Sequence, residues 1–217
     1  MKAGVRKVIF TVRTMVEDQG LTMLGEVSVD KTVDPFKVLI ATILSQRTRD
    51  ETTSGAVDDL FSRYSGASDL AEADKETLKE IIKPVNFYRV KATRIIEVAK
   101  IILKKFGGRV PSDLEDLMSL PSVGRKTANC VLVYGFQKLG IPVDTHVHRI
   151  SNRIGLVDTK SPDETESRLR EIVSQDFWMG INENFIKFGK TICRPIGPRC
   201  NICKLTNSCK AYNMGIF

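Results

Sequence analysis

The sequence contains no run approaching 18 consecutive apolar residues, so it offers no candidate for a membrane-spanning helix. Its first 20 residues are charged and periodic, and they lack the apolar stretch and small-residue cleavage site of a secretory signal peptide. These absences lead us to expect a cytoplasmic protein with no membrane association. Its five cysteines should therefore stay reduced rather than form disulfides.

Signals for β structure are equally scarce. No Asn-Gly or Asp-Gly pair stands between alternating apolar segments, and no internal repeat, low-complexity run or long linker is present. Apolar residues nevertheless make up 42% of the chain, which is enough for a globular core. The sequence therefore predicts an all-α fold with short connections.

Helix-capping signals support this prediction. Asp34–Pro35 precedes the apolar run FKVLIATIL and places proline at the first helical position. Both Ser112–Glu115 and Ser161–Glu164 have the Ser-x-x-Glu pattern of a capping box, in which the serine is the N-cap. Gly107–Gly108 should end a helix over residues 89–105.

The chain is basic, with a formal net charge of +7. From Asn184 onward there are six basic residues and no acidic one: Lys187, Lys190, Arg194, Arg199, Lys204 and Lys210. A balance of this kind favours a polyanionic partner, although a solvated basic tail would look the same.

Four of the five cysteines lie close together near the C-terminus, in the spacing C-x6-C-x2-C-x5-C. They are Cys193, Cys200, Cys203 and Cys209. A thiol quartet of this density in a reduced protein indicates a metal centre, either zinc or an iron–sulfur cluster. The fifth cysteine, Cys130, reads as a small buried apolar residue.

The centre of the chain reads LPSVGRKTAN, residues 120–129. A tight turn at Pro121–Gly124 should lead into a helix that begins at Arg125 or Lys126. Backbone N–H groups at Ser122, Gly124 and Arg125 would then face outward with the positive end of the helix dipole, which suits a phosphate. An ordinary connection between two helices remains the alternative.

Lys126 would lie in the first turn of this helix, where the dipole and the neighbouring Arg125 both lower a lysine pKa toward a neutral, nucleophilic amine. A surface lysine that binds phosphate is the alternative. Asp144, in VDTHVHR, would cap another helix. A capping carboxylate has a fixed position, so Asp144 could accept a proton from Lys126 or face positive charge on a reacting sugar.

Together these features resemble the helix–hairpin–helix DNA glycosylases of base excision repair, and within them the endonuclease III family. The resemblance is carried by LPSVGRKTAN (120–129), VDTHVHR (143–149), ILSQRTRD (43–50) and the four cysteines. It implies a six-helix barrel over residues 28–138 with the hairpin. It implies a second helical domain, built from residues 1–27 and 139–217, that holds a [4Fe–4S] cluster on the four cysteines.

The resemblance also implies the site and its chemistry. A damaged base is flipped out of the duplex, Lys126 attacks C1′ and forms a Schiff base, and β-elimination breaks the strand on the 3′ side. Asp144 activates the lysine. Gln46 or Arg47 fills the gap left by the flipped nucleotide.

Further positions follow from the same resemblance. Ser45 and Asp50 match polar pocket positions, and the loop between the first two cluster cysteines places Arg194 and Arg199 near the DNA backbone. The expected partner is double-stranded DNA with damaged bases or abasic sites in the nucleoid, and the expected state is a monomer.

The sequence departs from the family pattern at several positions. Members usually read LPGVG, whereas this chain has Ser122, which tolerates a positive φ poorly. The usual wedge glutamine aligns with Arg47, one place after Gln46. Met118 stands where many members have a pocket glutamate, so the preferred lesion stays open.

Two other functions fit parts of the pattern. One is a monofunctional glycosylase that removes thymine or uracil opposite guanine, or adenine, although such relatives usually lack the lysine. The other is a metal-stapled DNA-binding module without catalysis.

Overall fold

The computed structural model describes residues 3–28 and 33–216, and within these ranges the protein is helical without any β-strand. This confirms the predicted fold class. The chain divides into two compact units, which we name the central unit (Met23–Lys138) and the terminal unit (Met1–Thr22 with Leu139–Phe217). No helix in the described ranges is long and apolar enough to cross a bilayer.

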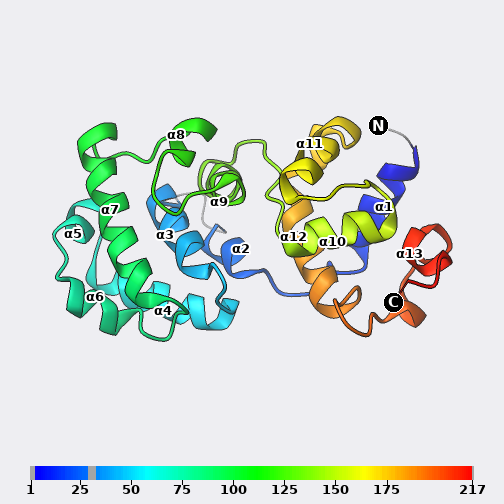
Figure 1. Ribbon diagram of the computed structural model, residues 1–217, viewed down its shortest axis with the longest axis horizontal. Coiled ribbons are helices and arrows are strands. Elements are labelled where there is room, and N and C mark those ends of the chain that lie inside the picture. The colour runs from blue at the N-terminus through cyan, green and yellow to red at the C-terminus, as the bar shows by residue number, and fades with distance from the viewer. Residues whose placement is uncertain (1–2, 29–32, 217) are drawn as a thin grey trace. The chain divides into compact units, whose positions relative to one another are not determined.

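The central unit is a bundle of helices joined by short loops (Figure 1). Its helices are α2 (Met23–Val27), α3 (Pro35–Ser45), α4 (Asp50–Arg63), α5 (Ala67–Ala71), α6 (Lys75–Ile81), α7 (Tyr88–Phe106), α8 (Leu114–Met118), α9 (Arg125–Cys130) and a π-helical turn, η1 (Val131–Gly135). Helix α3 is the axis of the bundle, because it contacts α2, α4, α7, α9 and η1. Its residues Val38 to Ile40 are completely buried, as expected for a helix that is apolar all round.

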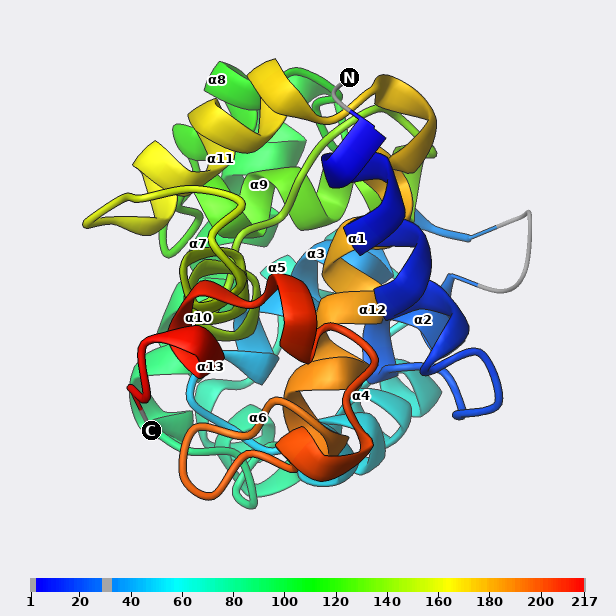
Figure 2. The same cartoon turned by 90° about the vertical axis from the view of Figure 1, so that its right-hand side faces the viewer.

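The terminal unit joins the two ends of the chain. It contains α1 (Ala3–Thr14), α10 (Thr145–Ile154), α11 (Pro162–Ile172), α12 (Trp178–Thr191), α13 (Lys210–Asn213) and the 3-10 turns η2 (Gln175–Phe177), η3 (Cys200–Ile202) and η4 (Thr206–Ser208). Helix α12 packs against both α1 and α10, and Figure 2 shows α1 running alongside it. Phe185 and Phe188 of α12 fill the core of this unit.

Most of the predicted helix ends are confirmed. The Asp34 carboxylate accepts the N–H of Phe36 at 2.9 Å and caps α3. Helix α7 ends at Gly107, which adopts the left-handed conformation with φ +60°. Ser161 accepts the N–H of Glu164 at 3.2 Å and caps α11.

One predicted cap is wrong by one residue. Helix α8 is capped by Asp113, whose Oδ1 accepts the N–H of Glu115 at 2.9 Å. The expected cap, Ser112, instead accepts from the Lys138 ammonium at its carbonyl (2.7 Å) and its hydroxyl (2.8 Å). Aspartate is as good an N-cap as serine, and its negative charge is also favoured at the positive end of a helix, so Asp113 serves as the cap while Ser112 binds Lys138.

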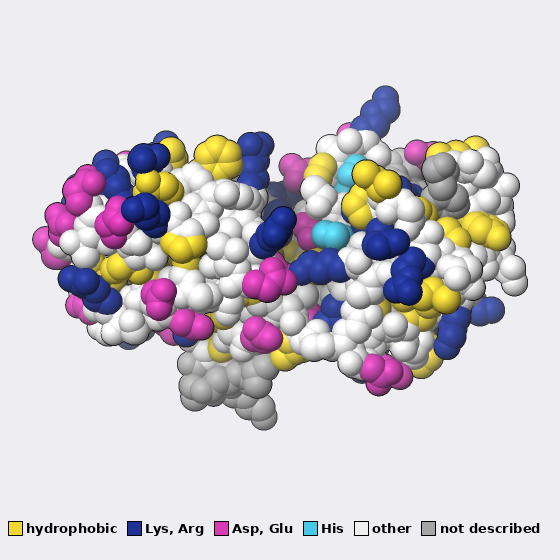
Figure 3. Space-filling view, turned by 90° about the horizontal axis from the view of Figure 1, so that it is seen from below, with side chains coloured by type: hydrophobic (Ala, Val, Ile, Leu, Met, Phe, Trp, Pro, Cys, Tyr) yellow, Lys and Arg dark blue, Asp and Glu magenta, His cyan; other side chains and the backbone are white. Residues whose placement is uncertain are grey.

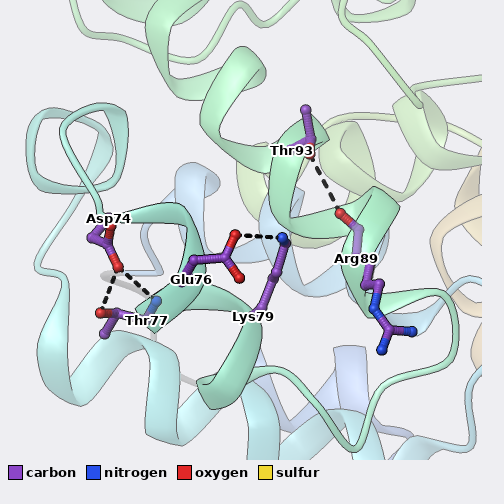
Figure 4. A network of polar contacts seen from close by, with 6 residues as sticks. All are labelled: Asp74, Glu76, Thr77, Lys79, Arg89 and Thr93. Carbon is purple, nitrogen blue, oxygen red and sulfur yellow. Dashed lines mark hydrogen bonds and ion pairs between the residues drawn. The ribbon is translucent and has the colours of Figure 1, made fainter.

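Helix α6 shows how local side chains define a short helix (Figure 4). Asp74 accepts both the N–H and the hydroxyl of Thr77 at 2.8 Å, and these bonds lower the pKa of the Asp74 carboxyl. Glu76 and Lys79, three residues apart, form an exposed ion pair at 2.6 Å. These contacts fix the N-terminus of α6, which packs against α7.

The contact between α10 and α12 depends on a glycine. A Cβ at Gly189 would lie 2.3 Å from Nδ1 of His146 and 3.0 Å from both Nη2 of Arg149 and Cδ1 of Ile150. The two helices can therefore approach as they do only because this position has no side chain. Gly55 in α4 is the opposite case, because a Cβ there would meet nothing within 4 Å.

We expect Gly189→Ala to lower the free energy of unfolding by about 1–3 kcal/mol, because the added methyl group overpacks the interface between α10 and α12. The matched control, Gly55→Ala, should raise it by up to about 1 kcal/mol through helix propensity alone. Urea denaturation of both variants measures these changes. Equal effects of the two substitutions would contradict the packing argument.

Candidate active site and metal centre

The predicted hairpin is present in the central unit, between α8 and α9. The turn closes with a hydrogen bond from the N–H of Val123 to the carbonyl of Leu120 at 3.2 Å. Leu120 and Val123 are 3% and 5% exposed, so their side chains anchor the turn in the core. Ser122 and Gly124 are exposed between and beside them. The apolar residues hold the turn, and the small residues face outward.

Ser122 adopts the left-handed conformation, with φ +63°. This conformation costs an L-residue roughly 1–2 kcal/mol, whereas glycine adopts it freely. The serine therefore adds strain to the turn, and it keeps the backbone N–H that a phosphate could accept.

Helix α9 begins at Arg125, directly after the turn. Its N-cap is Gly124, and no side chain among the described residues bonds to the capping position. Arg125 and Lys126 are half-buried in the first turn, while Thr127 to Cys130 are buried and fix the helix. Lys126 thus lies beside backbone N–H groups at the positive end of a helix, as the sequence predicts.

Gln46 and Arg47, the two candidates for filling the gap left by a flipped nucleotide, follow α3. The side-chain amide of Gln46 donates to the carbonyl of Ser122 at 2.9 Å, so it ties the end of α3 to the hairpin. Arg47 has a positive φ of +55°, and its exposed guanidinium lies 5.8 Å from the centre of the Phe87 ring. The two neighbours therefore differ: one holds the hairpin and the other faces solvent.

The residues predicted to line the base pocket flank this segment. Ser45 is the last residue of α3 and donates its hydroxyl proton to the carbonyl of Thr42 at 2.8 Å. Asp50 is the first residue of α4, and both side chains are half-buried. The hairpin, Gln46, Arg47, Ser45 and Asp50 all belong to the central unit.

Asp144 belongs to the terminal unit, where it caps α10 as predicted. Its Oδ1 accepts the N–H of His146 at 2.9 Å and that of Val147 at 2.8 Å. Both bonds reach the same oxygen, and no described residue donates a hydrogen bond to Oδ2. The carboxylate is therefore held in a fixed orientation with one oxygen available.

All four C-terminal cysteines line one pocket in the terminal unit, together with apolar residues that include Phe188, Ile192 and Leu205. Their side chains are half-buried, and burial raises the pKa of the Cys193, Cys200 and Cys203 thiols. Nη1 of Arg153 lies 3.9 Å from Sγ of Cys193, where it can donate to a thiolate.

The chemistry of this pocket suits a metal centre. The four thiols line one pocket, so soft sulfur ligands gather at a single place in the terminal unit. Thiolates are ligands of both zinc and iron–sulfur clusters.

Two arginines that the sequence analysis did not single out hold the loop between Cys193 and Cys200. Nη2 of Arg149 donates to the carbonyl of Cys193 at 2.9 Å. Arg153 donates to the carbonyls of Arg194 and Pro195 at 2.7 and 2.8 Å. Their spacing of four residues places them on one face of α10, which is the signal that could have identified them.

This loop presents the two predicted DNA-contact arginines at its surface. Arg194 is exposed and donates to the carbonyl of Gly197 at 3.0 Å. Arg199 is also exposed, and its backbone N–H bonds to the carbonyl of Ile192 at 2.8 Å. On the face shown in Figure 3, basic side chains are spread over both units with acidic side chains among them, so the net charge does not form one stripe there.

A helical hairpin with a lysine at its second helix, and a thiol quartet in a separate helical unit, are the features of a helix–hairpin–helix DNA repair protein. Residues 40–175 match the HhH-GPD superfamily of base excision DNA repair proteins, and the chain belongs to this family.

Within the family, the chain is similar to endonuclease III. It is 52% identical over 182 residues to Endonuclease III of Thermotoga maritima, covering 84% of this chain and 85% of that protein. It is 43% identical to Endonuclease III homolog 2, chloroplastic, of Arabidopsis thaliana, covering 80% of this chain but 47% of the longer relative.

Solved structures agree with this placement. A trapped covalent intermediate of endonuclease III with DNA superposes with a TM-score of 0.89 and 31% identity, covering 100% of this chain and 99% of that chain. A thermostable thymine-DNA glycosylase shares the fold, with a TM-score of 0.80, 23% identity and coverage of 96% of each chain.

The strain at Ser122 gives a test of the hairpin geometry. Ser122→Gly should raise the free energy of unfolding by about 0.5 kcal/mol, because relief of the left-handed strain outweighs the larger chain entropy of glycine in the unfolded state. The control Ser122→Ala keeps the strain and removes only the hydroxyl. If urea denaturation finds alanine as stabilising as glycine, the assigned backbone conformation is wrong.

Proposed function

We propose that the protein is a bifunctional DNA glycosylase and AP lyase that removes oxidised pyrimidines from double-stranded DNA and cuts the strand at the abasic site. The observation that carries the proposal is the position of Lys126, half-buried in the first turn of α9 directly after the hairpin. The similarity to endonuclease III, including a structure trapped as a covalent intermediate with DNA, supports it.

The chemistry uses Lys126 as nucleophile. Its neutral amine forms a bond to C1′ while the bond from C1′ to the base breaks, and the base leaves with that electron pair and takes up a proton. Opening of the sugar ring gives a Schiff base. Loss of a proton from C2′ then expels the 3′ phosphate, and water hydrolyses the Schiff base to free the lysine.

Asp144 is the proton acceptor and electrostatic partner in this proposal. The N–H groups of His146 and Val147 hold Oδ1, so the carboxylate does not need to reorganise during the reaction. Oδ2 serves the reacting groups: it takes the lysine proton and faces the positive charge that develops on the sugar.

The remaining residues bind DNA. The N–H groups of Ser122, Gly124 and Arg125 bind a phosphate, which positions the enzyme without reading sequence. Arg194 and Arg199 add backbone contacts, and either Arg47 or Gln46 occupies the space left by the flipped nucleotide. Ser45 and Asp50 line the pocket for the damaged base, and the enzyme acts as a monomer.

A [4Fe–4S] cluster bound by the four cysteines is the proposed metal centre. Such a cluster supplies a rigid, thiolate-bound anchor for the surrounding chain. Arg153 compensates the negative charge of Cys193 and fixes the loop that carries Arg194. The cluster is proposed as structural, with no step of the reaction assigned to it.

The alternatives are less well supported. A monofunctional mismatch glycosylase has no need of a lysine at the hairpin, and the match to a thymine-DNA glycosylase, at 23% identity, indicates a shared fold alone. A non-catalytic DNA-binding module would use Lys126 only to bind phosphate and Asp144 only as a helix cap, and the similarity to endonuclease III, including a covalent intermediate with DNA, favours an enzyme instead.

Borohydride trapping tests the nucleophile. The wild-type protein should form a covalent adduct with an abasic duplex, and Lys126→Gln should form none and should leave the strand uncut, because an amide cannot form a Schiff base. Lys105→Gln, at an exposed lysine of the same unit, is the control and should trap normally. An adduct of undiminished yield with Lys126→Gln would refute the assignment.

The metal centre is tested by colour and metal content. Protein purified without chelator should be yellow-brown, with broad visible absorption and iron and sulfide in equal amounts. Cys203→Ser should lose most of this absorption, whereas Cys130→Ser, at the buried cysteine of α9, should keep it. Colourless wild-type protein with stoichiometric zinc would contradict the cluster.

A further inference from the structure

A buried lysine that the proposed chemistry does not use lies under the segment that follows α3. Lys91, in the first turn of α7, is 6% exposed. Its ammonium lies 2.7 Å from the carbonyl of Leu44, 2.6 Å from the carbonyl of Gln46 and 3.2 Å from the hydroxyl of Thr48. All three acceptors belong to one stretch of five residues.

The charge state of Lys91 follows from these contacts. Burial lowers the pKa of Lys91 to about 8. An ammonium has three N–H donors and a neutral amine has two, so three acceptors are fully served only by the charged form. The last carbonyls of a helix also carry partial negative charge and lack partners within the helix, which favours a cation at this place.

Asn86 holds the same segment through two further hydrogen bonds. The backbone N–H of Asn86 donates to the hydroxyl of Thr48 at 3.2 Å, and its side-chain amide donates to the carbonyl of Arg47. Arg47 itself has a positive φ, which persists only where surrounding contacts compensate the strain. Lys91 and Asn86 therefore fix an unfavourable backbone turn that directs the Arg47 side chain to solvent.

We propose that Lys91 is a positioning residue for lesion recognition in duplex DNA: it fixes the backbone of Gln46 to Thr48, and with it the direction of the Arg47 side chain, so that this side chain can enter the space left by a flipped nucleotide. The inference rests on the proposed function, in which either Arg47 or Gln46 occupies that space. A loop that is already rigid avoids the entropy cost of ordering at the moment of binding.

Lys187 is a second buried lysine, and it serves as a control for Lys91. It is 8% exposed, in the terminal unit, and forms an ion pair with Glu183 at 3.1 Å. It holds no segment that is proposed to contact DNA. Lys187→Met is therefore a control of matched burial and matched chemical change.

The experiment compares two abasic substrates for each variant: a duplex, in which the nucleotide must be flipped, and a single strand, in which no gap forms. Lys91→Met should lower kcat/KM for duplex cleavage by about tenfold or more, as expected for loss of hydrogen bonds from a charged group, and change single-strand cleavage by no more than about twofold. Lys187→Met should leave the ratio of duplex to single-strand cleavage unchanged, whatever its effect on thermal stability.

The outcomes separate the two proposals. Wild-type protein that cuts neither substrate would refute the proposed function. Wild-type protein that cuts both, with Lys91→Met lowering both equally or neither, would refute the role of Lys91 alone.

A substitution at an exposed residue, Asn86, tests the same inference if the Lys91→Met variant does not fold. Asn86→Ala removes the side-chain bond to Arg47 from an exposed position and should lower the same ratio by about threefold, as for one hydrogen bond of average strength. On a Gln46→Ala, Arg47→Ala background, neither Asn86→Ala nor Lys91→Met should lower the ratio further, because the side chains that they position are gone. A full additional loss on that background would overturn the inference.

Discussion

This protein depends on how the unpaired backbone groups at its helix ends are satisfied. The first N–H groups and the last carbonyl groups of a helix have no partner within that helix and must find one elsewhere. Asp144 satisfies the start of α10, and Lys91 satisfies the end of α3. The N-cap of α9 is Gly124, which has no side chain to serve as a cap, so the start of this helix is suited to an anion. The same local requirement thus gives a fixed carboxylate, a fixed loop and a phosphate site, depending on which group meets it.

Helix α10 connects the features of the terminal unit. Its first turn is held by Asp144, and its arginines, Arg149 and Arg153, bond to the carbonyls of the loop after Cys193. Gly189 allows α12 to pack closely against the same helix. The position of the carboxylate and the path of the cysteine loop are therefore set by one rigid element, which explains why a loop without regular structure can present arginines in defined places.

How far the sequence could predict this structure depends on the range of the interaction. Caps at Asp34, Asp144 and Ser161 are set by neighbours within three residues, so they could be predicted, and the family followed from the hairpin and cysteine motifs. Asp113 took the place expected for Ser112, which bonds to Lys138, a residue 26 positions away that the local pattern does not show.

Contacts between distant segments could not be predicted. Lys91 bonds to the end of α3, more than 40 positions away in the sequence. Arg153 donates to the carbonyl of Arg194, which is 41 positions away. Nothing in the local pattern shows that these cations turn inward, or that Arg47 adopts a positive φ. The π-helical turn after α9 packs against α3, and no local pattern in its residues indicates it.

The inward direction of these cations changes the meaning of the net charge. Four cations bond to carbonyl or carboxylate oxygens of their own chain: Lys91, Arg149, Arg153 and Lys187. They therefore contribute little to neutralising the phosphates of a nucleic acid. The number of ions displaced when a polyanion binds is set by the outward-facing cations. The ionic-strength dependence of association should therefore be shallower than the count of basic residues suggests.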